Sequence, residues 1–230
     1  MKIFIILPFV QAFKQFNWYY DNRIHNFGNI GIGGKFHSFM APYSSRIIDK
    51  IAYNGIDIRL ESVKNTKIYS YYENPRILDI GCGVGISTKS LKKIYPESNI
   101  YGIDCSISML NNCEKESGIK YIKNFAHKTS FINNSFDIIN SMFLFHEVPQ
   151  LGRKQLLNEI DRILRPGGLL NILDIRLKYT PNSFMLSGEP FLLDYLENFD
   201  QDLSSLKYQE LNKLNTNSKQ FDKLYIKPFY

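Results

Sequence analysis

The fold of this chain is decided by residues 76–85, which read Arg-Ile-Leu-Asp-Ile-Gly-Cys-Gly-Val-Gly. A short apolar run leads into Asp79, and three glycines follow at alternate positions, Gly81, Gly83 and Gly85. This pattern predicts a buried strand, a tight turn and the start of a helix. Glycine lets the main chain of such a turn approach a ligand closely, and the N–H groups at the helix start can serve the ligand's oxygen atoms. We therefore expect a cofactor-binding turn here.

The spacing of the glycines separates two kinds of cofactor. A dinucleotide-binding turn reads Gly-x-Gly-x-x-Gly, and its third glycine would fall at position 86, where this chain has Ile86. Asp79 would gain nothing beside a pyrophosphate, whereas it could help to position the ammonium group of an amino-acid moiety. The frame Asp-x-Gly-x-Gly-x-Gly resembles the first motif of class I S-adenosylmethionine-dependent methyltransferases. The resemblance implies S-adenosyl-L-methionine as the cofactor and S-adenosyl-L-homocysteine as its product.

Further motifs of that family follow in order along the middle of the chain. Residues 99–103 predict a second strand that ends in Asp104, where an acid can accept both ribose hydroxyls of a nucleoside. Ser106 is expected to cap the helix that comes next. Residues 135–140 resemble the family's fourth strand. Residues 162–168 resemble its helix with a Pro-Gly-Gly turn, and residues 169–174 resemble its fifth strand. An ordered set of motifs is far more specific than a single one.

The alternation of strand and helix patterns over residues 75–174 predicts a parallel sheet with right-handed crossovers. The implied fold class is α/β, a Rossmann-like three-layer sandwich with a mostly parallel sheet. Residues 1–74 are expected to form a helical, aromatic N-terminal cap or lid, and residues 75–230 the S-adenosylmethionine-binding methyltransferase domain. The family's sheet usually ends in an antiparallel pair, but only residues 225–229 predict a strand in the last region. We therefore expect an abbreviated antiparallel C-terminal edge, which the cap or a partner subunit, as in a homodimer, would have to cover.

Several helices are predicted outside the core motifs. Residues 42–63 have apolar residues at helical spacing, among them Ile47, Ile48 and Ile51. Residues 152–165 predict a core-facing helix that Pro166 ends, and residues 189–199 predict another.

Glycines also mark the cap. Residues 28–34 contain four of them between aromatic-rich flanks, a composition that predicts an interruption with hinge freedom. Residues 11–40 are therefore expected to act as a lid over the cofactor, and a static set of turns is the alternative. Residues 1–12 form an apolar stretch that either packs against the domain or serves as a short leader or membrane-associated segment. No stretch reaches the roughly 18 apolar residues of a membrane-spanning helix.

Composition describes an ordinary globular chain of 230 residues, 44% of them hydrophobic, with a formal net charge of +6. The lysines are scattered and form no block of like charges, so a nucleic-acid partner is not favoured. Three cysteines cannot make a disulfide framework, which indicates a reducing, cytoplasmic location. No Cys-x-x-Cys or histidine pair occurs at metal-ligand spacing, so no metal site is expected.

The resemblance assigns cofactor contacts to the strand ends and the turns that follow them. The predicted set is Asp79, Gly81, Cys82, Gly83, Gly85, Asp104, Cys105, Met109, Asn124, Phe125, Ala126, Asn140 and Ser141. One position departs from the family's pattern, because many members carry an acid or asparagine before the alanine, to accept from the adenine amino group, and this chain has Phe125 there. Either Asn124 or a backbone carbonyl takes that bond, or apolar packing holds the adenine.

Candidates for catalysis follow the fourth strand, because active sites of open parallel sheets lie at the carboxyl ends of the strands. His146 is the candidate base, and a packing or helix-capping histidine is the alternative. Asp174 and His37 are weaker candidates. The cofactor already carries an activated methyl group, so a base is needed only for an alcohol, a phenol or an acidic carbon.

Three functions are compatible with these residues. The first is an S-adenosylmethionine-dependent methyltransferase that acts on a small molecule, such as a metabolite, phenol, quinone or lipid-like acceptor, by direct in-line transfer. The second is a nucleic-acid or protein methyltransferase, although residues 140–143 lack the Asn-Pro-Pro-Tyr-like motif that holds a flipped base. The third is a non-catalytic cofactor-binding partner subunit, since fold alone does not establish activity.

Overall fold

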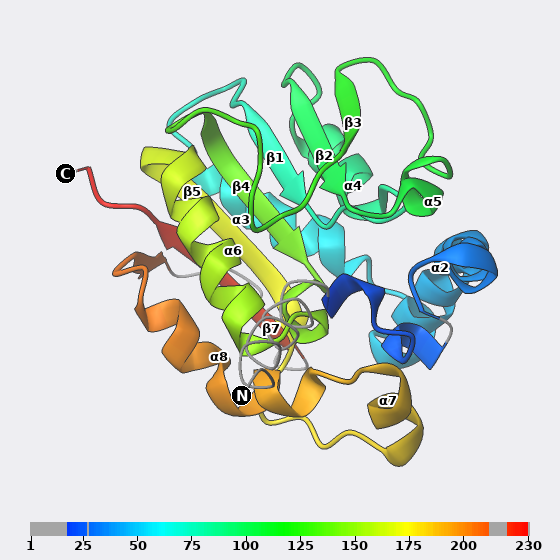
Figure 1. Ribbon diagram of the computed structural model, residues 1–230. Helices are drawn as coiled ribbons and strands as arrows, with labels where there is room; N and C mark the ends of the chain where they lie inside the picture. The colour runs from blue at the N-terminus through cyan, green and yellow to red at the C-terminus, as the bar shows by residue number, and fades with distance from the viewer. Residues whose placement is uncertain (1–17, 27, 212–219, 230) are drawn as a thin grey trace, which may run out of the picture.

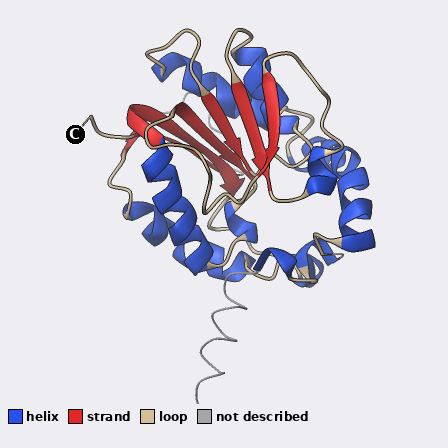
Figure 2. Ribbon diagram, turned by 45° about the horizontal axis from the view of Figure 1, so that its top comes forward, coloured by secondary structure: helices blue, strands red, loops and turns tan. Residues whose placement is uncertain are grey.

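A central sheet with helices on both faces forms the body of the protein (Figures 1 and 2). The computed structural model describes residues 18–26, 28–211 and 220–229. The strands are β1 (Ile77–Ile80), β2 (Ile100–Asp104), β3 (Ile119–Lys123), β4 (Phe136–Met142), β5 (Leu164–Ile175), β6 (Gln209–Leu211) and β7 (Gln220–Ile226). Their spatial order is β3-β2-β1-β4-β5-β7-β6, and β7 alone runs antiparallel to both of its neighbours. This arrangement confirms the predicted α/β class and its mostly parallel, Rossmann-like sheet.

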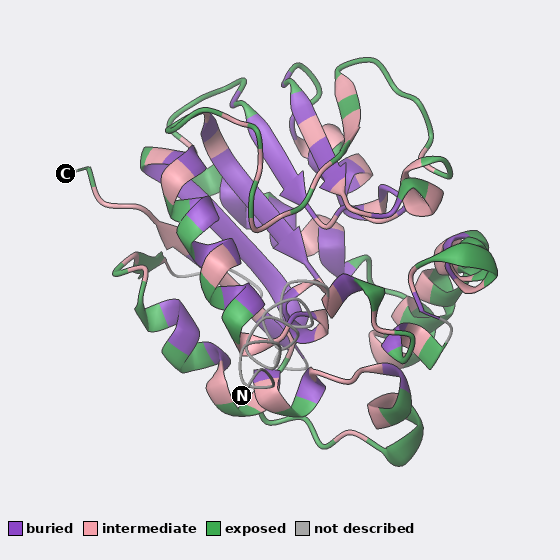
Figure 3. Cartoon of the chain, viewed as in Figure 1, coloured by how far each residue is buried: buried purple, intermediate pink, exposed green. Residues whose placement is uncertain are grey.

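The helices divide between the two faces of the sheet and the cap. They are η1 (Trp18–Tyr20), η2 (Ile24–Asn26), α2 (Gly31–Ala52), α3 (Ile58–Tyr69), α4 (Ile86–Ile94), α5 (Ile107–Leu110), η3 (Phe145–Glu147), α6 (Gln150–Ile163), α7 (Ser183–Gly188) and α8 (Leu192–Ser204). Successive side chains of a strand point to opposite faces, so Ile77 joins the core beneath α3 and α4 while Leu78 joins the core beneath α6 and α8. Both cores are closed to solvent along the middle strands (Figure 3).

The predicted antiparallel C-terminal edge is present and has one strand more than the sequence indicated. Both antiparallel strands are present, since β7 pairs with β5 over seven residues and β6 pairs with the end of β7. The edge is nonetheless short, because β6 has only three residues. Its sequence, Gln-Glu-Leu, is polar and mostly exposed, so it carries no apolar alternation that could predict a strand.

The helix before β5 ends earlier than its proline suggests. α6 ends at Ile163 and β5 begins at the next residue, so Pro166 lies outside the helix rather than at its end. The pairing of β4 with β5 jumps from Phe136–Leu164 to Ile138–Leu169, which leaves the Pro-Gly-Gly segment as a bulge. The helix predicted at residues 189–199 lies instead at Leu192–Ser204, which is α8. Helix α7, which precedes it, was not predicted.

The glycines of the cap interrupt its helices only in part. Gly28 and Gly31, with φ angles of 68° and 63°, lie where the chain passes from η2 into α2, whereas Gly33 and Gly34 lie within the first turn of α2. A Cβ on Gly34 would lie 2.4 Å from the backbone oxygen of Asn29, which means that close packing, rather than hinge freedom, requires glycine there. The predictions for residues 1–12 and for the start of the lid lie outside the described residues.

The segment 42–63, which is predicted to be helical, belongs to two helices, α2 and α3, that a turn separates. Ile47, Ile48 and Ile51 of α2 are exposed rather than buried. α3 packs against α4 and β5, so it forms part of the layered body even though it precedes β1. Among the described residues, no helix is both long and apolar enough to cross a membrane.

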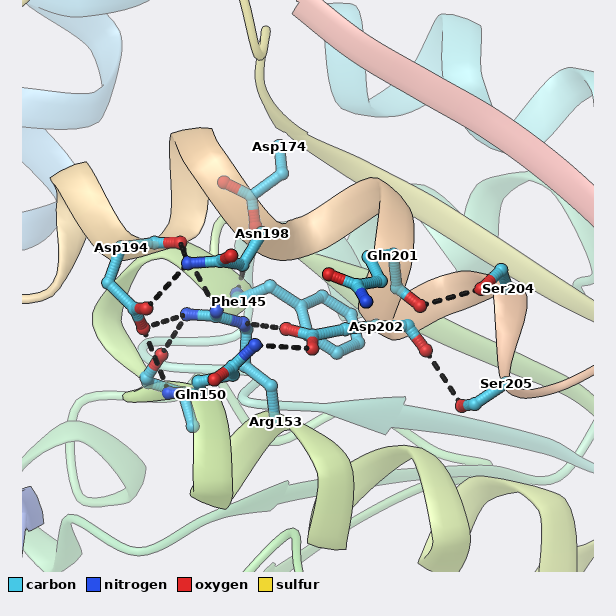
Figure 4. Close-up of polar contacts among 11 residues, drawn as sticks. Phe145, Gln150, Arg153, Asp174, Asp194, Asn198, Gln201, Asp202, Ser204 and Ser205 are labelled. Carbon is cyan, nitrogen blue, oxygen red and sulfur yellow. Dashed lines mark hydrogen bonds and ion pairs between the residues drawn. The ribbon is translucent and has the colours of Figure 1, made fainter.

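A buried arginine fastens α6 to α8 (Figure 4). Arg153 on α6 is fully buried, and its Nε lies 2.8 Å from Oδ2 of Asp202 on α8. Its Nη1 donates to the backbone oxygen of Val148 and lies 3.0 Å from a carboxylate oxygen of Asp194. Because Val148 follows η3 directly, this cluster also positions the segment that carries His146.

We expect Arg153→Ala to lower the free energy of unfolding by about 3–5 kcal/mol, because it leaves the buried carboxylate of Asp202 without its charged partner. The matched control is Arg23→Ala, which removes an exposed ion pair with Asp21 and should cost less than about 1 kcal/mol. Urea unfolding followed by circular dichroism measures both variants. Equal losses in the two would contradict the role assigned to Arg153.

Candidate active site at the carboxyl edge of the sheet

The glycine turn after β1 has three glycines for three different reasons. Gly81, Gly83 and Gly85 have φ angles of 69°, 54° and 83°, all in the left-handed region. A Cβ on Gly81 would press on the side chain of Leu144, and one on Gly85 would lie 2.4 Å from the hydroxyl of Tyr121. A Cβ on Gly83 would meet nothing within 4 Å. The backbone at Gly83 therefore borders open space, as a ligand cradle requires.

The side chain of Asp79 makes hydrogen bonds within the protein, beside this turn. Its side chain is fully buried, and its carboxylate accepts hydrogen bonds from Ser87 (2.7 Å), Thr88 (2.6 Å) and the amide of Asn140 (2.7 Å). Burial raises the pKa of Asp79, while these three donors act against that rise. The carboxylate ties the end of β1 to α4 and to β4. Its predicted contact with a cofactor ammonium group stays a prediction.

Asp104 lies beside the glycine turn, as its place at the end of β2 predicts. Its carboxylate accepts from the backbone N–H of Gly83 at 3.0 Å and from that of Ser106 at 2.7 Å. Burial raises the pKa of Asp104 to about 6, against the lowering effect of these two bonds. Ser106 caps α5 through Met109, which confirms the predicted cap.

The other predicted cofactor residues differ from one another in burial and in hydrogen bonding. Ser141, which pairs with Ile80 on β1, is buried, and its hydroxyl has no hydrogen-bond partner among the described residues. Asn124 accepts from the N–H of Phe125, whose ring is 39% exposed. Cys82 and Cys105 both have raised thiol pKa values, to which burial contributes, so these thiols stay protonated. The open cradle at Gly83 and the unpartnered hydroxyl of Ser141 fit a bound polar molecule.

His146 forms a dyad with Asp174 at the same edge. Its Nδ1 lies 2.6 Å from one carboxylate oxygen of Asp174, whose other oxygen accepts from the N–H of Phe145. Burial disfavours the charged imidazole, but Asp174 outweighs it and raises the pKa of His146 to about 9. The second ring nitrogen, Nε2, lies 3.9 Å from Glu189.

A further cluster adjoins the dyad, and three of its members escaped sequence reasoning. His25 of η2 lies between two carboxylates, with Nε2 3.1 Å from Glu147 and Nδ1 3.0 Å from Glu189. Burial alone would lower the pKa of His25, but these carboxylates raise it to about 10. The ring of His37 lies 4.0 Å from that of His25, and its pKa is lowered to about 4 by burial and by the neighbouring charge. The members are far apart in sequence, so spacing gave no signal.

Comparison with known proteins agrees with this geometry. Residues 77–168 match the family described as "Methyltransferase domain". Together with the seven-stranded sheet and the glycine turn, the match identifies this part of the chain as a class I S-adenosylmethionine-dependent methyltransferase domain.

Curated relatives are similar over part of their length. The chain is 31% identical over 99 residues to malonyl-[acyl-carrier protein] O-methyltransferase of Legionella pneumophila, which covers 41% of this chain and 34% of that protein. It is 30% identical over 152 residues to demethylmenaquinone methyltransferase of Thermotoga maritima, which covers 62% and 64% respectively. The chain therefore spans from about one third to just under two thirds of these relatives.

Solved structures share the fold. A methyltransferase from Aquifex aeolicus that depends on S-adenosylmethionine superposes with a TM-score of 0.58 at 21% identity, over 78% of this chain and 97% of that one. Phosphoethanolamine N-methyltransferase 2 of Haemonchus contortus, solved with S-adenosyl-L-methionine, gives 0.55 at 18% identity, over 73% and 52%.

We expect Gly83→Val to weaken binding of S-adenosylhomocysteine by about a hundredfold or more, because the branched side chain would fill the open space above the turn. Its left-handed backbone adds a cost of about 1–2 kcal/mol to folding. Gly55→Val is the matched control, since Gly55 also has a positive φ, 77°, and open space around it.

Isothermal titration calorimetry and urea unfolding separate the two effects. Both variants should lose similar stability, and only Gly83→Val should lose affinity. Full affinity in a folded Gly83→Val protein would exclude this turn as the cofactor cradle.

Proposed function

We propose that this protein transfers a methyl group from S-adenosyl-L-methionine directly to a small-molecule acceptor. The observation that carries the proposal is the open backbone at Gly83 joined to the Asp104 carboxylate, at the same edge of the sheet as the His146–Asp174 dyad. When bound, the cofactor supplies a methyl group already activated on a sulfonium. The protein then has to bind the cofactor and the acceptor, orient them for the transfer, and exclude water from the site.

Several residues fit the parts of this cofactor. Asp104 would accept the ribose hydroxyls, since its carboxylate lies beside the glycine turn. The turn itself would face the amino-acid moiety, and Phe125, half exposed after β3, would pack on the adenine. This edge carries more carboxylates than protonated imidazoles, with Asp104, Glu147, Asp174 and Glu189 against His25 and His146. That balance favours a cationic cofactor.

His146 would hold the acceptor. Asp174 engages Nδ1, so Nε2 is the ring nitrogen left for an acceptor oxygen. Among the relatives, the names malonyl-[acyl-carrier protein] O-methyltransferase and fatty-acid O-methyltransferase describe transfer to oxygen, and demethylmenaquinone methyltransferase describes a quinone substrate. These names support an acceptor from the metabolite, quinone or lipid-like class.

Incubating the protein with methyl-labelled S-adenosylmethionine and fractionated extracts of its source cells tests the proposal. We expect label in the small-molecule or lipid fraction. Label confined to RNA or protein would favour a macromolecular substrate, and cofactor binding without any transfer would favour a non-catalytic partner subunit.

With the labelled acceptor in hand, His146→Ala should lower kcat by about a hundredfold and leave cofactor affinity within about threefold. Asp104→Ala is the contrasting variant, and it should weaken cofactor binding by roughly ten- to a hundredfold, because a hydrogen bond to a charged group is lost. An unchanged kcat in His146→Ala would make His146 a packing residue.

The cap would close over this site. Its described part contacts the domain through a Tyr19–Phe125 edge-to-face pair and through His25 on Glu147. Hydrogen exchange with and without S-adenosylhomocysteine should show greater protection of residues 18–26 and 28–40 in the bound state. Helix α6, which packs against β5 and α8, is the internal control. Equal protection of the cap in both states would leave it as static scaffold.

A further inference from the structure

Three ionisable side chains from separate segments converge beside the dyad. His25 comes from η2 in the cap, Glu147 from η3 after β4, and Glu189 from the residue that follows α7. Their side chains are only 21%, 23% and 13% exposed. One ligand atom of each lies within 4.8 Å of those of the other two.

The cluster also has unused lone pairs. Oε2 of Glu189 is buried and accepts no hydrogen bond from any described residue, and it lies 3.9 Å from Nε2 of His146. Nδ1 of His37 is likewise buried without a hydrogen-bond partner among the described residues, and its ring lies against that of His25. A buried acceptor without a partner is costly, and binding an ion is one ordinary way in which such an acceptor is satisfied.

We infer that His25, Glu147 and Glu189 bind one divalent transition-metal ion. Mixed imidazole and carboxylate donors suit Zn²⁺, Mn²⁺ or Fe²⁺, whereas Mg²⁺ and Ca²⁺ prefer oxygen donors throughout.

Binding an ion would draw the ligand atoms together. Tetrahedral ligands about 2.1 Å from one ion lie about 3.4 Å apart, so ligand atoms that now lie within 4.8 Å of one another have to approach by up to about 1.4 Å. His25 can give the ion only one of its nitrogens, so the carboxylate that now faces the other nitrogen turns toward the ion. Without an ion, a protonated His25 supplies the positive charge between the two carboxylates.

The position of the site gives it a structural consequence. Its ligands join the cap to the segment after β4 and to the end of α7, so a bound ion would fasten these three segments together beside His146. With three protein ligands, the ion keeps at least one position for water or another oxygen ligand.

Metal binding is measured on the full chain after chelator treatment, without cofactor or acceptor, so the result does not depend on methyl transfer. Titration with ZnCl₂ by calorimetry, and zinc content after dialysis, should give one ion per chain. His25→Ala and Glu189→Gln should each weaken binding by about a hundredfold or more, exceeding the roughly 10–100-fold effect of changes outside the ligand set. Glu189→Gln keeps the side-chain shape and decides the question if His25→Ala does not fold.

The free thiols are the competing zinc ligands. Cys82 and Cys113 both approach the carbonyl oxygen of Gly83, so a protein with both changed to serine is the first control. His127→Ala, a histidine outside the cluster, is the second, and both controls should keep one zinc per chain. The inference is overturned if the unaltered chain binds no zinc, or if binding survives Glu189→Gln and is lost in the double cysteine variant.

Discussion

The glycine turn after β1 depends on the buried carboxylate of Asp79. Donors from α4 and β4 converge on it, and the amide of Asn140 that serves it is itself held by Asn171 of β5 through a 2.8 Å hydrogen bond. A buried charge is tolerated only when its hydrogen bonds are complete, so this network fixes the relative positions of three adjacent strands. The left-handed glycines and the open space at Gly83 follow from where that network anchors the end of β1.

The turn and the strand ends of the proposed cofactor side could be predicted because their information is local. A strand, an acid and three glycines are contiguous in the chain. The position of Asp104 follows from one further rule, which is that neighbouring parallel strands end at the same edge of the sheet. Nothing in the sequence indicated that Asp79 also accepts from Ser87 and Thr88, because only the helix brings these donors back over the strand. Its contact with a ligand stays a prediction.

The errors in the fold have a common physical origin, which is that tertiary packing overrode local composition. The glycines at the start of α2 suggested a hinge, yet the backbone of Asn29 lies so close to Gly34 that no side chain fits there. Pro166 suggested a helix end, yet it lies in a bulge of β5. Strand β6 lacks any apolar pattern and exists because β7 presents an edge for it to pair with.

On the acceptor side the sequence indicated His146, with Asp174 and His37 as weaker candidates. It did not indicate the cluster around His25, and the extent of the family match explains why. That match spans residues 77–168, which contain the glycine turn, Asp104 and His146. The partners that define the environment of His146 lie beyond it: Asp174 and Glu189 follow the matched region, and His25 and His37 precede it. The proposed cofactor contacts thus lie in the shared core, whereas the groups that would meet an acceptor are assembled from the cap and from the chain after β5. Only long-range contacts bring them together, so their chemistry became visible only in three dimensions.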